Sequence, residues 1–407
     1  MLYRLQTAGY AAYLVGGGIR DLLTGCHPKD FDVVTDARPE QIKRLFHRCF
    51  LIGKRFRLAH VYFGSGKVEV ATFRAGGHPS LFNKKHYLKS KVGMVMRDNV
   101  YGSLEEDVWR RDFTVNAIYY NIADFSLVDY CGGLEDMNNK SIRVIGNPLE
   151  RYHEDPVRLL RAVRFAAKLD FNIESETEAP LFELGELLQH VSPSRLGDEV
   201  QKLFLSGFAE KSFLLLRRYQ LFKWLFAQTD FCLTEKSEFM ANGIVNLALK
   251  DMDVRFNEGR GVSAAFLFSI MLWPAMQHLY YQYLSENMSE PEAYEKASVK
   301  VLAQQNRQFI VVRRTALMVH EIWRMQRQLL RRGVHAAHLL KHHYFHFALD
   351  FLKFRIMSGE DQSMLLDWWR DFHTASTEEQ QTMLEVLPAI PRGHHSKRRR
   401  GRRRRYR

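Results

Sequence analysis

The sequence predicts an α+β protein in which a mixed α/β head is followed by an all-helical neck and body. Short apolar runs punctuated by glycines fill the first part of the chain, as is typical of strands joined by tight turns. From Asn147-Pro148 to about Pro388, glycines are few and apolar residues recur with the 3.6-residue period of helices. Because 407 residues suffice for two or three domains, we interpret the change near residue 147 as a domain boundary.

The positive charge of the chain is concentrated at one end. The net charge is +13, but residues 392–407 contain ten Lys and Arg residues and no acidic residue, so the first 391 residues carry only +3. This low-complexity tail cannot bury a core, and we expect it to be disordered. The chain as a whole is 46% hydrophobic, which excludes a wholly disordered protein.

The cysteines and the apolar segments favour an intracellular compartment. The four cysteines lie far apart without a C-x-x-C pair, which argues against a disulfide framework or a thiolate metal site. The N-terminus lacks the pattern of a signal peptide. The most apolar stretch, residues 264–276, contains Ser269 and Pro274 and is too short to cross a bilayer. We therefore expect a soluble cytoplasmic protein with no membrane span.

Strand and helix patterns alternate along the head. Pro39 marks the first turn of a helix, and Gly64-Ser65-Gly66 marks the turn of a hairpin. The expected elements are a strand at 13–15, a helix from 19, a strand at 31–35, a helix at 39–46, a hairpin of 59–63 and 67–74, a mobile surface loop over 75–103, and strand or helix–strand segments at 115–121 and 127–130.

The body is predicted to consist of helices with long apolar stripes, such as residues 214–226. Four histidines also fall on one face of a predicted helix, at a spacing that metal ligands use: His335, His338, His342 and His346. Interleaved aromatic residues allow an RNA-stacking surface as well. No Cys, Asp or Glu is adjacent, so an amphipathic helix with a partly exposed histidine face is the simpler interpretation.

A glycine triplet, Gly16-Gly17-Gly18, follows the first predicted strand, and Arg20 lies just beyond it. Glycines let a backbone approach a phosphate closely, the start of a helix offers free N–H groups, and a guanidinium adds a forked cation. Gly17, Gly18 and Arg20 are therefore candidate nucleotide-binding residues. Taken alone, a tight turn before a helix explains the same residues.

Two aspartates, Asp30 and Asp32, stand at the beginning of the second predicted strand. Residues i and i+2 of a strand face the same side, so both carboxylates would point one way. Paired hard oxygen ligands bind Mg²⁺, which can lower the pKa of a hydroxyl and bind a triphosphate. An isolated Asp-x-Asp is usually a solvated edge, but its place shortly after Gly-Gly-x-x-Arg makes the pair a candidate catalytic and metal-binding site.

The third candidate segment is Arg110-Arg111-Asp112, beside a predicted apolar element. Arg111 could bind phosphate, and Asp112 could complete the acidic cluster as a third catalytic carboxylate. We expect Arg110 to pair with an acidic residue and order the loop. Glu69 is a rival third carboxylate because it faces outward between two core valines, but an exposed hairpin glutamate is the simpler interpretation, and we do not include it in the catalytic set.

These segments belong to a longer series of motifs: Leu14-Val-Gly-Gly-Gly-Ile-Arg-Asp-Leu-Leu, Lys29-Asp-Phe-Asp-Val, Val70-Ala-Thr-Phe-Arg, Arg110-Arg-Asp-Phe-Thr-Val-Asn-Ala, Gly146-Asn-Pro, Glu154-Asp-Pro-Val-Arg-Leu-Leu-Arg and Ser192-Pro-Ser-Arg-Leu. The series resembles the class II nucleotidyltransferases, namely the bacterial tRNA CCA-adding enzymes and bacterial poly(A) polymerases of the polymerase β superfamily. It covers roughly the first half of the chain in the family's order. The resemblance implies a polymerase-β-like nucleotidyltransferase head on a small mixed sheet, with ATP as substrate and two Mg²⁺ ions held by Asp30 and Asp32.

A basic helix is predicted after Asp155-Pro156, which make a good helix start. Arg158, Arg161 and Arg164 recur every third residue along one side of it, where they could hold a triphosphate and contact a base edge. The resemblance implies that Asp155 and Arg158 form the template for the nucleobase and that the later arginines, Arg161 first, touch phosphates. A solvated helix face is a credible alternative for Arg164.

Two features separate the two sister activities. The segment Leu51-Ile-Gly-Lys-Arg-Phe-Arg-Leu-Ala-His-Val resembles the signature of the bacterial poly(A) polymerases, and those enzymes commonly end in Arg/Lys-rich segments, as this chain does. A polymerase that holds varied RNA 3′ ends needs sequence-independent affinity, which phosphate neutralisation supplies. The sequence thus favours a template-independent poly(A) polymerase that adds AMP from ATP to RNA 3′ ends, releases pyrophosphate and promotes RNA 3′-end processing and decay.

Two alternatives stay open. One is a tRNA CCA-adding enzyme; the other is a catalytically idle RNA-binding protein that acts through its tail, against which the Asp30–Asp32 pair argues. The partners expected are RNA 3′ ends and ATP, and the sequence identifies no RNA-decay protein partner. The expected division is a catalytic head at 1–146, a helical neck for nucleotide base and RNA at 147–208, an RNA-binding helical body at 209–390 and the tail at 391–407.

Overall fold

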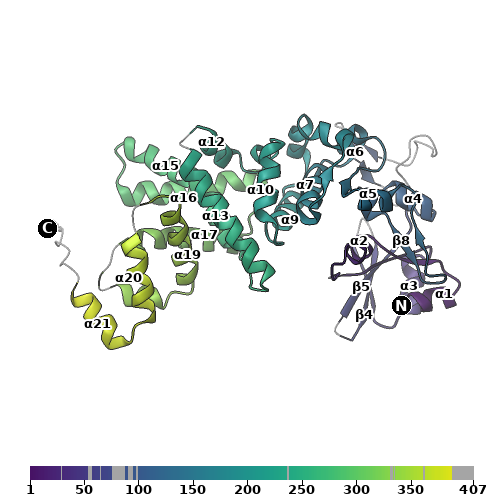
Figure 1. The fold of residues 1–407 in the computed structure, drawn as a ribbon, viewed down its shortest axis with the longest axis horizontal. Helices are drawn as coiled ribbons and strands as arrows, with labels where there is room; N and C mark the ends of the chain where they lie inside the picture. The colour runs from purple at the N-terminus through teal and green to yellow at the C-terminus, as the bar shows by residue number, and fades with distance from the viewer. Residues whose placement is uncertain are drawn as a thin grey trace, which may run out of the picture. The chain divides into compact units, whose positions relative to one another are not determined.

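The computed structural model of the chain (Figure 1) describes residues 1–28, 30–53, 57–64, 66–75, 88–89, 95–97, 100–235, 238–330, 333, 335–360 and 363–386. The tail expected to be disordered, most of the loop expected at 75–103, Lys29 and the basic residues Lys54 and Arg55 lie outside these residues. The chain forms two compact units, Met1–Val319 and His320–Arg407. The boundaries expected at 146 and 208 fall inside the first unit.

A seven-stranded mixed sheet forms the centre of the head (Figure 1). Its strands β2 and β5 run parallel, and its other neighbouring strands run antiparallel. The strand order is β3 (Cys49–Ile52), β4 (Leu58–Phe63), β5 (Gly66–Thr72), β2 (Asp32–Thr35), β1 (Ala12–Val15), β8 (Tyr119–Asn121) and β9 (Leu127–Val128). The strands expected at 13–15, 31–35, 59–63 and 67–74 are therefore present.

Side-chain alternation along the strands gives the sheet two faces. One face packs on helices α1 (Leu2–Thr7) and α3 (Pro39–Leu45) through a buried apolar cluster that includes Leu5, Val33, Ile42, Val61 and Val70. The other face is covered over β1, β2 and β8 by a second cluster that includes Val15, Val34, Val108, Ala117 and Tyr119. Asp32 lies on this second face, because it is two residues before Val34 in the same strand.

The remaining elements of the head are short. Ser103 caps α4 through its Oγ, which accepts a hydrogen bond from the backbone N–H of Glu106. The Glu106 carboxylate in turn accepts one from the backbone N–H of Ser103, which completes a capping box. These elements are α2 (Gly17–Leu23), α4 (Leu104–Trp109), the 3₁₀ helix η2 (Thr114–Asn116), α5 (Gly133–Asn138), the antiparallel pair β6 (Leu88–Lys89) and β7 (Val95–Arg97), and the strand β10 (Ser141–Ile142), which pairs in parallel with β11 (Asn172–Ile173).

Helices predominate from residue 147 onward (Figure 1). Asn147 caps the first of them, with its Oδ1 3.2 Å from the backbone nitrogen of Glu150, and Pro148 occupies the first turn. The helices that lie within the first unit are α6 (Pro148–Glu154), α7 (Val157–Leu169), α8 (Ser175–Glu178), η3 (Ala179–Leu181), η4 (Leu184–His190), α9 (Pro193–Phe204), α10 (Ala209–Arg218), α11 (Phe222–Leu225), α12 (Ala227–Glu235), α13 (Glu238–Asn257), α14 (Ala264–Met271), α15 (Trp273–Ser285) and α16 (Glu290–Gln308).

Helix α17 (Arg313–Leu329) begins in the first unit and ends in the second, which continues with α18 (Ala336–Leu340), α19 (Phe345–Met357), α20 (Ser363–Thr374) and α21 (Thr377–Glu385). Phe345, Trp369 and Phe372 are fully buried in the core of this unit. The prediction of one helix with four histidines on one face is wrong. His335 precedes α18, His342 lies between α18 and α19, and His346 lies in α19.

No helix among the described residues combines the length and the apolar character that crossing a bilayer requires.

Candidate active site

The glycine triplet packs directly against the acidic segment. Gly16 joins β1 to α2 with φ +78°, a conformation that favours glycine. A Cβ atom at Gly16 would lie 3.7 Å from Oδ2 of Asp32 and 3.8 Å from Nη1 of Arg111. A Cβ atom at Gly18 would lie only 3.0 Å from the backbone oxygen of Asp30, so the loop needs a glycine there. The structure thus brings together the glycine triplet, the aspartate pair and Arg111.

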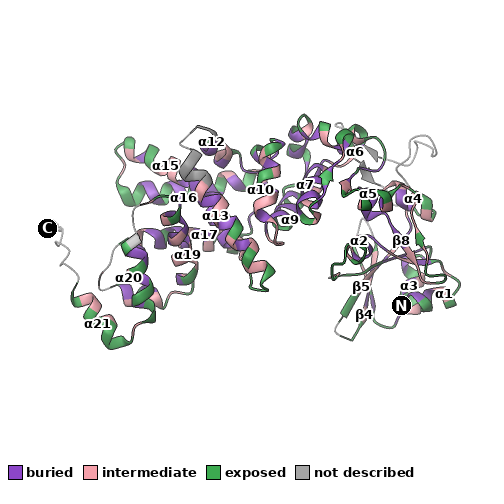
Figure 2. Cartoon of the chain, in the orientation of Figure 1, coloured by how far each residue is buried: buried purple, intermediate pink, exposed green. Residues whose placement is uncertain are grey.

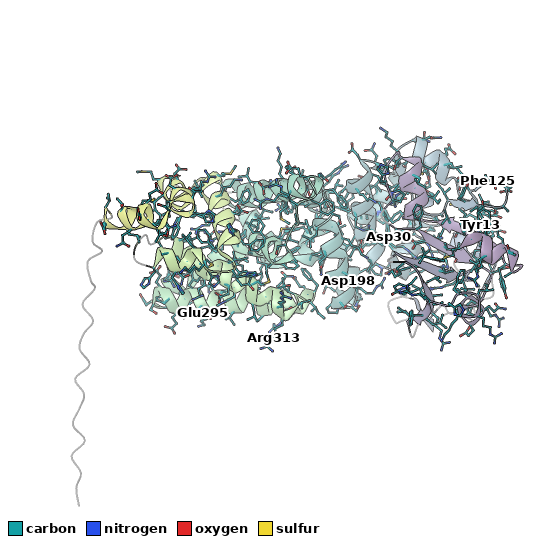
Figure 3. The ribbon with its side chains drawn as sticks, turned by 90° about the horizontal axis from the view of Figure 1, so that it is seen from below. Tyr13, Asp30, Phe125, Asp198, Glu295 and Arg313 are labelled. Atoms are coloured by element: carbon teal, nitrogen blue, oxygen red, sulfur yellow. The ribbon has the colours of Figure 1, made fainter. Side chains whose placement is uncertain are left out.

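The two aspartates sit where a strand begins. Asp32 is the first residue of β2, Asp30 precedes the strand, and both are exposed. Figure 3, which labels Asp30 and Tyr13, places Asp30 on the side of the head nearer to the helices after residue 147. Desolvation raises the pKa of Asp32, and the charges of Glu69 and Asp30 raise it further, while Arg111 and Lys67 act in the opposite direction. Negative charge at this site is therefore only partly compensated.

Glu69 is the carboxylate that the sequence interpretation set aside. It pairs with Asp32 in the parallel register of β2 and β5, so the two side chains project from the same face. Lys67 Nζ lies 2.8 Å from Glu69 Oε1, and His60 Nε2 lies 3.3 Å from the same oxygen. The outward position of Glu69 was visible in the alternation of β5, but the pairing of β5 with β2 was not.

The donor set fits a hard divalent cation. Asp30, Asp32 and Glu69 offer carboxylate oxygens, which Mg²⁺ prefers, and the raised pKa of Asp32 marks negative charge that a cation would neutralise. Within the described residues, no three His, Cys, Asp or Glu side chains are already gathered as a metal site. The fit therefore rests on the chemistry of the donors and not on a preformed cage.

Arg111 is held in place by a buried network around Asp107. Its Nε donates to the hydroxyl of Tyr119 at 2.7 Å, and its Nη2 donates to Asp107 Oδ2 at 3.1 Å. The Tyr119 hydroxyl donates to the same Asp107 oxygen at 2.7 Å. Burial by itself would lower the pKa of Arg111, but Tyr119 and Asp107 outweigh it and raise the pKa, so the guanidinium stays charged. Arg110 pairs with Asp107 as well, as expected of a residue that orders the loop.

Asp112 has hydrogen-bond partners in the head and in α7. It accepts hydrogen bonds from the backbone nitrogen of Phe113 at 2.8 Å, from Asn116 at 3.1 Å and from Arg161 Nε at 2.6 Å. Burial would raise the pKa of Asp112, but the charge of Arg161 and these bonds hold it well below its usual range. The structure therefore shows Asp112 and Arg161 as an ion pair, and the role of Asp112 as a third catalytic carboxylate beside Asp30 and Asp32 stays a prediction.

Arg20 is also placed otherwise than the sequence suggested. Its side chain is 3% exposed and donates to Asp21 at 2.6 Å and to Asn116 at 2.5 Å. The nearest neighbour that a Cβ at Gly17 would meet is Arg20 Nη2, at 3.4 Å. The guanidinium thus fastens α2 to η2 and does not project toward solvent where a phosphate could reach it.

The base-recognition candidates are brought close to each other at the start of α7. Asp155 ends α6, and its Oδ2 lies 2.9 Å from Nη2 of Arg195 of α9. Arg158 Nη1 donates to the backbone oxygen of Arg151 at 2.7 Å and lies 3.4 Å from Glu154. Both side chains therefore carry partners that a nucleotide would have to replace.

Comparison with known proteins assigns the family. Curated poly(A) polymerase I of Salmonella typhi is 42% identical over 395 residues, which cover 96% of this chain and 85% of that protein. The chain belongs to the poly(A) polymerase family. The family model described as "Poly A polymerase head domain" matches residues 12–143, that of a "Probable RNA and SrmB- binding site of polymerase A" matches 170–233, and that of the "Polymerase A arginine-rich C-terminus" matches 286–405.

Sister enzymes share part of the poly(A) polymerase sequence and most of its fold. A CCA-adding enzyme of Lactobacillus helveticus is 33% identical and covers 62% of this chain and 64% of its own length. The crystal structure of Bacillus stearothermophilus CCA-adding enzyme in complex with CTP has a TM-score of 0.62 at 23% identity, and covers 95% of this chain and 81% of that one. The resemblance to class II nucleotidyltransferases and the α+β fold are therefore confirmed, and the chain is a polynucleotide adenylyltransferase.

Proposed function

We propose that this poly(A) polymerase transfers AMP repeatedly from ATP to the 3′-hydroxyl of RNA, without a template, at the site formed by Asp30, Asp32 and Glu69. The observation that carries the choice of activity is the extent of the match. Poly(A) polymerase I matches 96% of the chain at 42% identity, whereas the CCA-adding enzyme of L. helveticus matches 62% at 33%.

The three carboxylates would hold Mg²⁺, which supplies a Lewis acid for the reacting hydroxyl and the triphosphate. The 3′-hydroxyl gives up its proton to solvent as its oxygen attacks the α-phosphorus of ATP, the bond from that phosphorus to the bridging oxygen breaks, and pyrophosphate leaves with the electron pair. Asp32 anchors the site because its backbone is fixed in the sheet between Val15 and Glu69. Asp30 lies two residues before Asp32, in the loop that leads into the strand, and would add its carboxylate from there.

Arg111 and the glycine triplet would hold the phosphates. Arg111 is permanently charged, and its Nη1 faces the surface where Gly16 leaves no side chain. A phosphate close to the backbone at Gly16 and Gly17 would meet this cation directly. Arg20 is not assigned this role, since its guanidinium is buried against Asn116.

Asp155 and Arg158 would position the adenine. Both lie at the junction of α6 and α7, and each offers hydrogen-bonding atoms that suit the edge of a base. Binding would exchange the Arg195–Asp155 and Arg158–Glu154 contacts for contacts with the base. Arg161 could contact phosphate only if its ion pair with Asp112 were broken, so we propose a smaller role for Arg161 in binding the nucleotide.

RNA would be held by the helices and by the ten cations of the tail, in sequence-independent fashion. We propose that the enzyme acts in the cytoplasm on RNA 3′ ends and so promotes 3′-end processing and decay.

The decisive assay supplies Mg²⁺, a generic unstructured RNA and each ribonucleoside triphosphate separately. Long ladders with ATP alone support poly(A) synthesis. Addition limited to a tRNA lacking its 3′ end, with CTP used before ATP, would instead identify a CCA-adding enzyme and overturn the proposal.

A further inference from the structure

The sheet face that carries Asp32 continues beyond Glu69 to the edge of the sheet. The strand register places Glu69 opposite His60 of β4, and His60 opposite Phe50 of β3. Residues that pair across strands project from the same face. Asp32, Glu69, His60 and Phe50 therefore form a single row that runs from the candidate active site to the edge strand.

The outer part of this row exposes aromatic and aliphatic surface. In β3, Cys49 and Leu51 face the core, whereas Phe50 is 60% exposed and Ile52 is 46% exposed. Figure 2 colours the chain by burial, with exposed residues in green. Phe50 meets Tyr62 of β4 edge to face, with ring centroids 5.8 Å apart. Exposed aromatic pairs on a sheet face are surfaces on which nucleic-acid bases can stack.

A cation borders the aromatic pair. Lys67 of β5 pairs with Tyr62 in the register, is 40% exposed and contacts Glu69 at 2.8 Å. Aromatic rings beside a lysine are the combination that single-stranded nucleic acids use, because bases stack while phosphates meet the charge.

The order of the strands indicates from which side RNA arrives. The glycine triplet and Arg111, which would hold the triphosphate, lie beside β1, on one side of β2. In phosphoryl transfer the attacking and leaving oxygens stand roughly in line. The RNA hydroxyl must therefore approach from the opposite side of β2, which is the side of β5, β4 and β3.

We infer that Phe50 and Tyr62, with Lys67, form a platform on which bases of the single-stranded RNA substrate stack just upstream of its reacting 3′ end. This inference rests on the proposed function. Phe50 lies three strands from Asp32, about 14 Å at the usual spacing of strands, so the platform takes a nucleotide upstream of the terminal one. Stacking accepts any base, which suits an enzyme that extends varied RNA ends.

The test uses the full chain with Phe50→Ala, a change at an exposed side chain. The KM for a short unstructured oligoribonucleotide should rise about tenfold, the loss expected when one base–aromatic stack is removed. The KM for ATP and the kcat should stay within about twofold, and the slope of log Kd against log salt should not change, because no charge is removed. Phe50→Trp should restore the KM for RNA.

Tyr3→Ala is the matched control, because Tyr3 is 61% exposed on α1, which packs on the opposite face of the sheet. An unchanged RNA KM and Kd in Phe50→Ala, or an equal rise in the KM for ATP, would overturn the platform. If the wild-type chain adds no AMP to RNA, the proposed function fails instead, while the Kd of Phe50→Ala for the same oligoribonucleotide still decides on the platform.

Discussion

Asp107 organises the phosphate side of the site from a fully buried position. Its carboxylate receives Arg110, Arg111, the Tyr119 hydroxyl and, at 3.1 Å, the backbone nitrogen of Arg74. Burial would raise the pKa of Asp107, but the two arginines outweigh it and hold the pKa below its usual value. Since the carboxylate stays charged, it fixes Arg111 so that Nη1, which also lies 3.5 Å from the backbone oxygen of Asn116, is close to Gly16.

Arg111→Gln and Arg110→Gln form a matched pair around this carboxylate. Each removes one positive charge from Asp107, but the described contacts of Arg110 do not reach the glycine triplet. We expect Arg111→Gln to raise the KM for ATP by about tenfold or more, since a charge-assisted phosphate contact is lost. Arg110→Gln should leave the KM for ATP within about threefold of the wild-type value. Steady-state kinetics decide, and equal changes would contradict the role of Arg111.

Glu69→Gln and Asp112→Asn distinguish the two candidates for the third carboxylate. Glu69→Gln should lower kcat by about 10²-fold to 10³-fold with little change in thermal stability, because Glu69 lies beside Asp32 and is partly exposed. Asp112→Asn should instead destabilise the fold by about 1–2 kcal/mol, because it leaves the half-buried Arg161 without its charged partner. Single-turnover kinetics and calorimetry on the same samples measure both effects.

The pH dependence of the stability of the fold follows in part from the lowered pKa of Asp112. A carboxyl with a lowered pKa in the folded state stabilises the protein fully above its unfolded pKa of 3.8 and loses that effect as the pH falls through the folded value. The stability difference between wild type and Asp112→Asn should therefore shrink below about pH 4.

A larger loss of kcat in Asp112→Asn than in Glu69→Gln would favour Asp112 over Glu69 as the third catalytic carboxylate.

For single residues, the sequence predicted which residues lie together at the site better than it predicted which residues they contact. Asp30, Asp32 and Arg111 were placed correctly near the glycine triplet, because their motifs have fixed spacings. Beside their local contacts, Arg20 binds Asn116 and Asp112 binds Arg161, which lie 96 and 49 residues away along the chain, and no local pattern encodes such contacts. The position of Glu69 beside Asp32 could not be predicted for the same reason, since it depends on the parallel pairing of two strands.

Helix α7 joins the head to the helices of the first unit through ion pairs. Four of its basic residues each meet a carboxylate from a different segment: Arg158 with Glu154 of α6, Arg161 with Asp112 of the head, Arg164 with Glu199 of α9, and Lys168 with Asp21 of α2. Buried or half-buried pairs of this kind fix orientation more than they stabilise the fold. A nucleotide that binds at α7 must compete with some of them.

Arg158→Ala should reduce discrimination among nucleotides more than it reduces kcat with saturating ATP. The preference for ATP over CTP, GTP and UTP should fall by about tenfold, because a base-edge hydrogen bond is lost. Arg164→Ala is the control, since Arg164 lies on the same helix and is engaged by Glu199. Competition between labelled nucleotides measures the effect. An unchanged preference for ATP in Arg158→Ala would exclude the templating role.

At the scale of elements, periodicity predicted helices but not their breaks. The apolar stripe at 214–226 is interrupted after Arg218, where Gln220 adopts φ +55° before α11 begins at Phe222. The histidine segment is likewise divided between α18 and α19. Both breaks let apolar residues on successive short helices reach one core, as Phe213, Phe222 and Phe226 do through contacting rings. A sequence window records the period and not this tertiary requirement.

At the scale of the whole molecule, the distribution of charge predicts how RNA is retained. Removing residues 392–407 deletes ten cations and leaves every described residue in place. RNA affinity and product length should both fall at low salt, while transfer of a single AMP stays within about twofold. The salt slope of log Kd should become shallower, because each lost phosphate contact releases fewer counterions. Equal slopes for full-length and truncated protein would show that the tail does not bind RNA.

The most direct test of the active-site assignment is single-turnover transfer of AMP from ATP to a generic RNA by the double variant Asp30→Asn/Asp32→Asn in Mg²⁺. We expect the rate of transfer to fall by at least about 10³-fold, because the carboxylates that would hold the metal are gone. RNA affinity should remain within about twofold, and Asp36→Asn, an exposed change just past the end of β2, should behave as wild type. Substantial AMP transfer by the double variant would contradict the assignment of the active site.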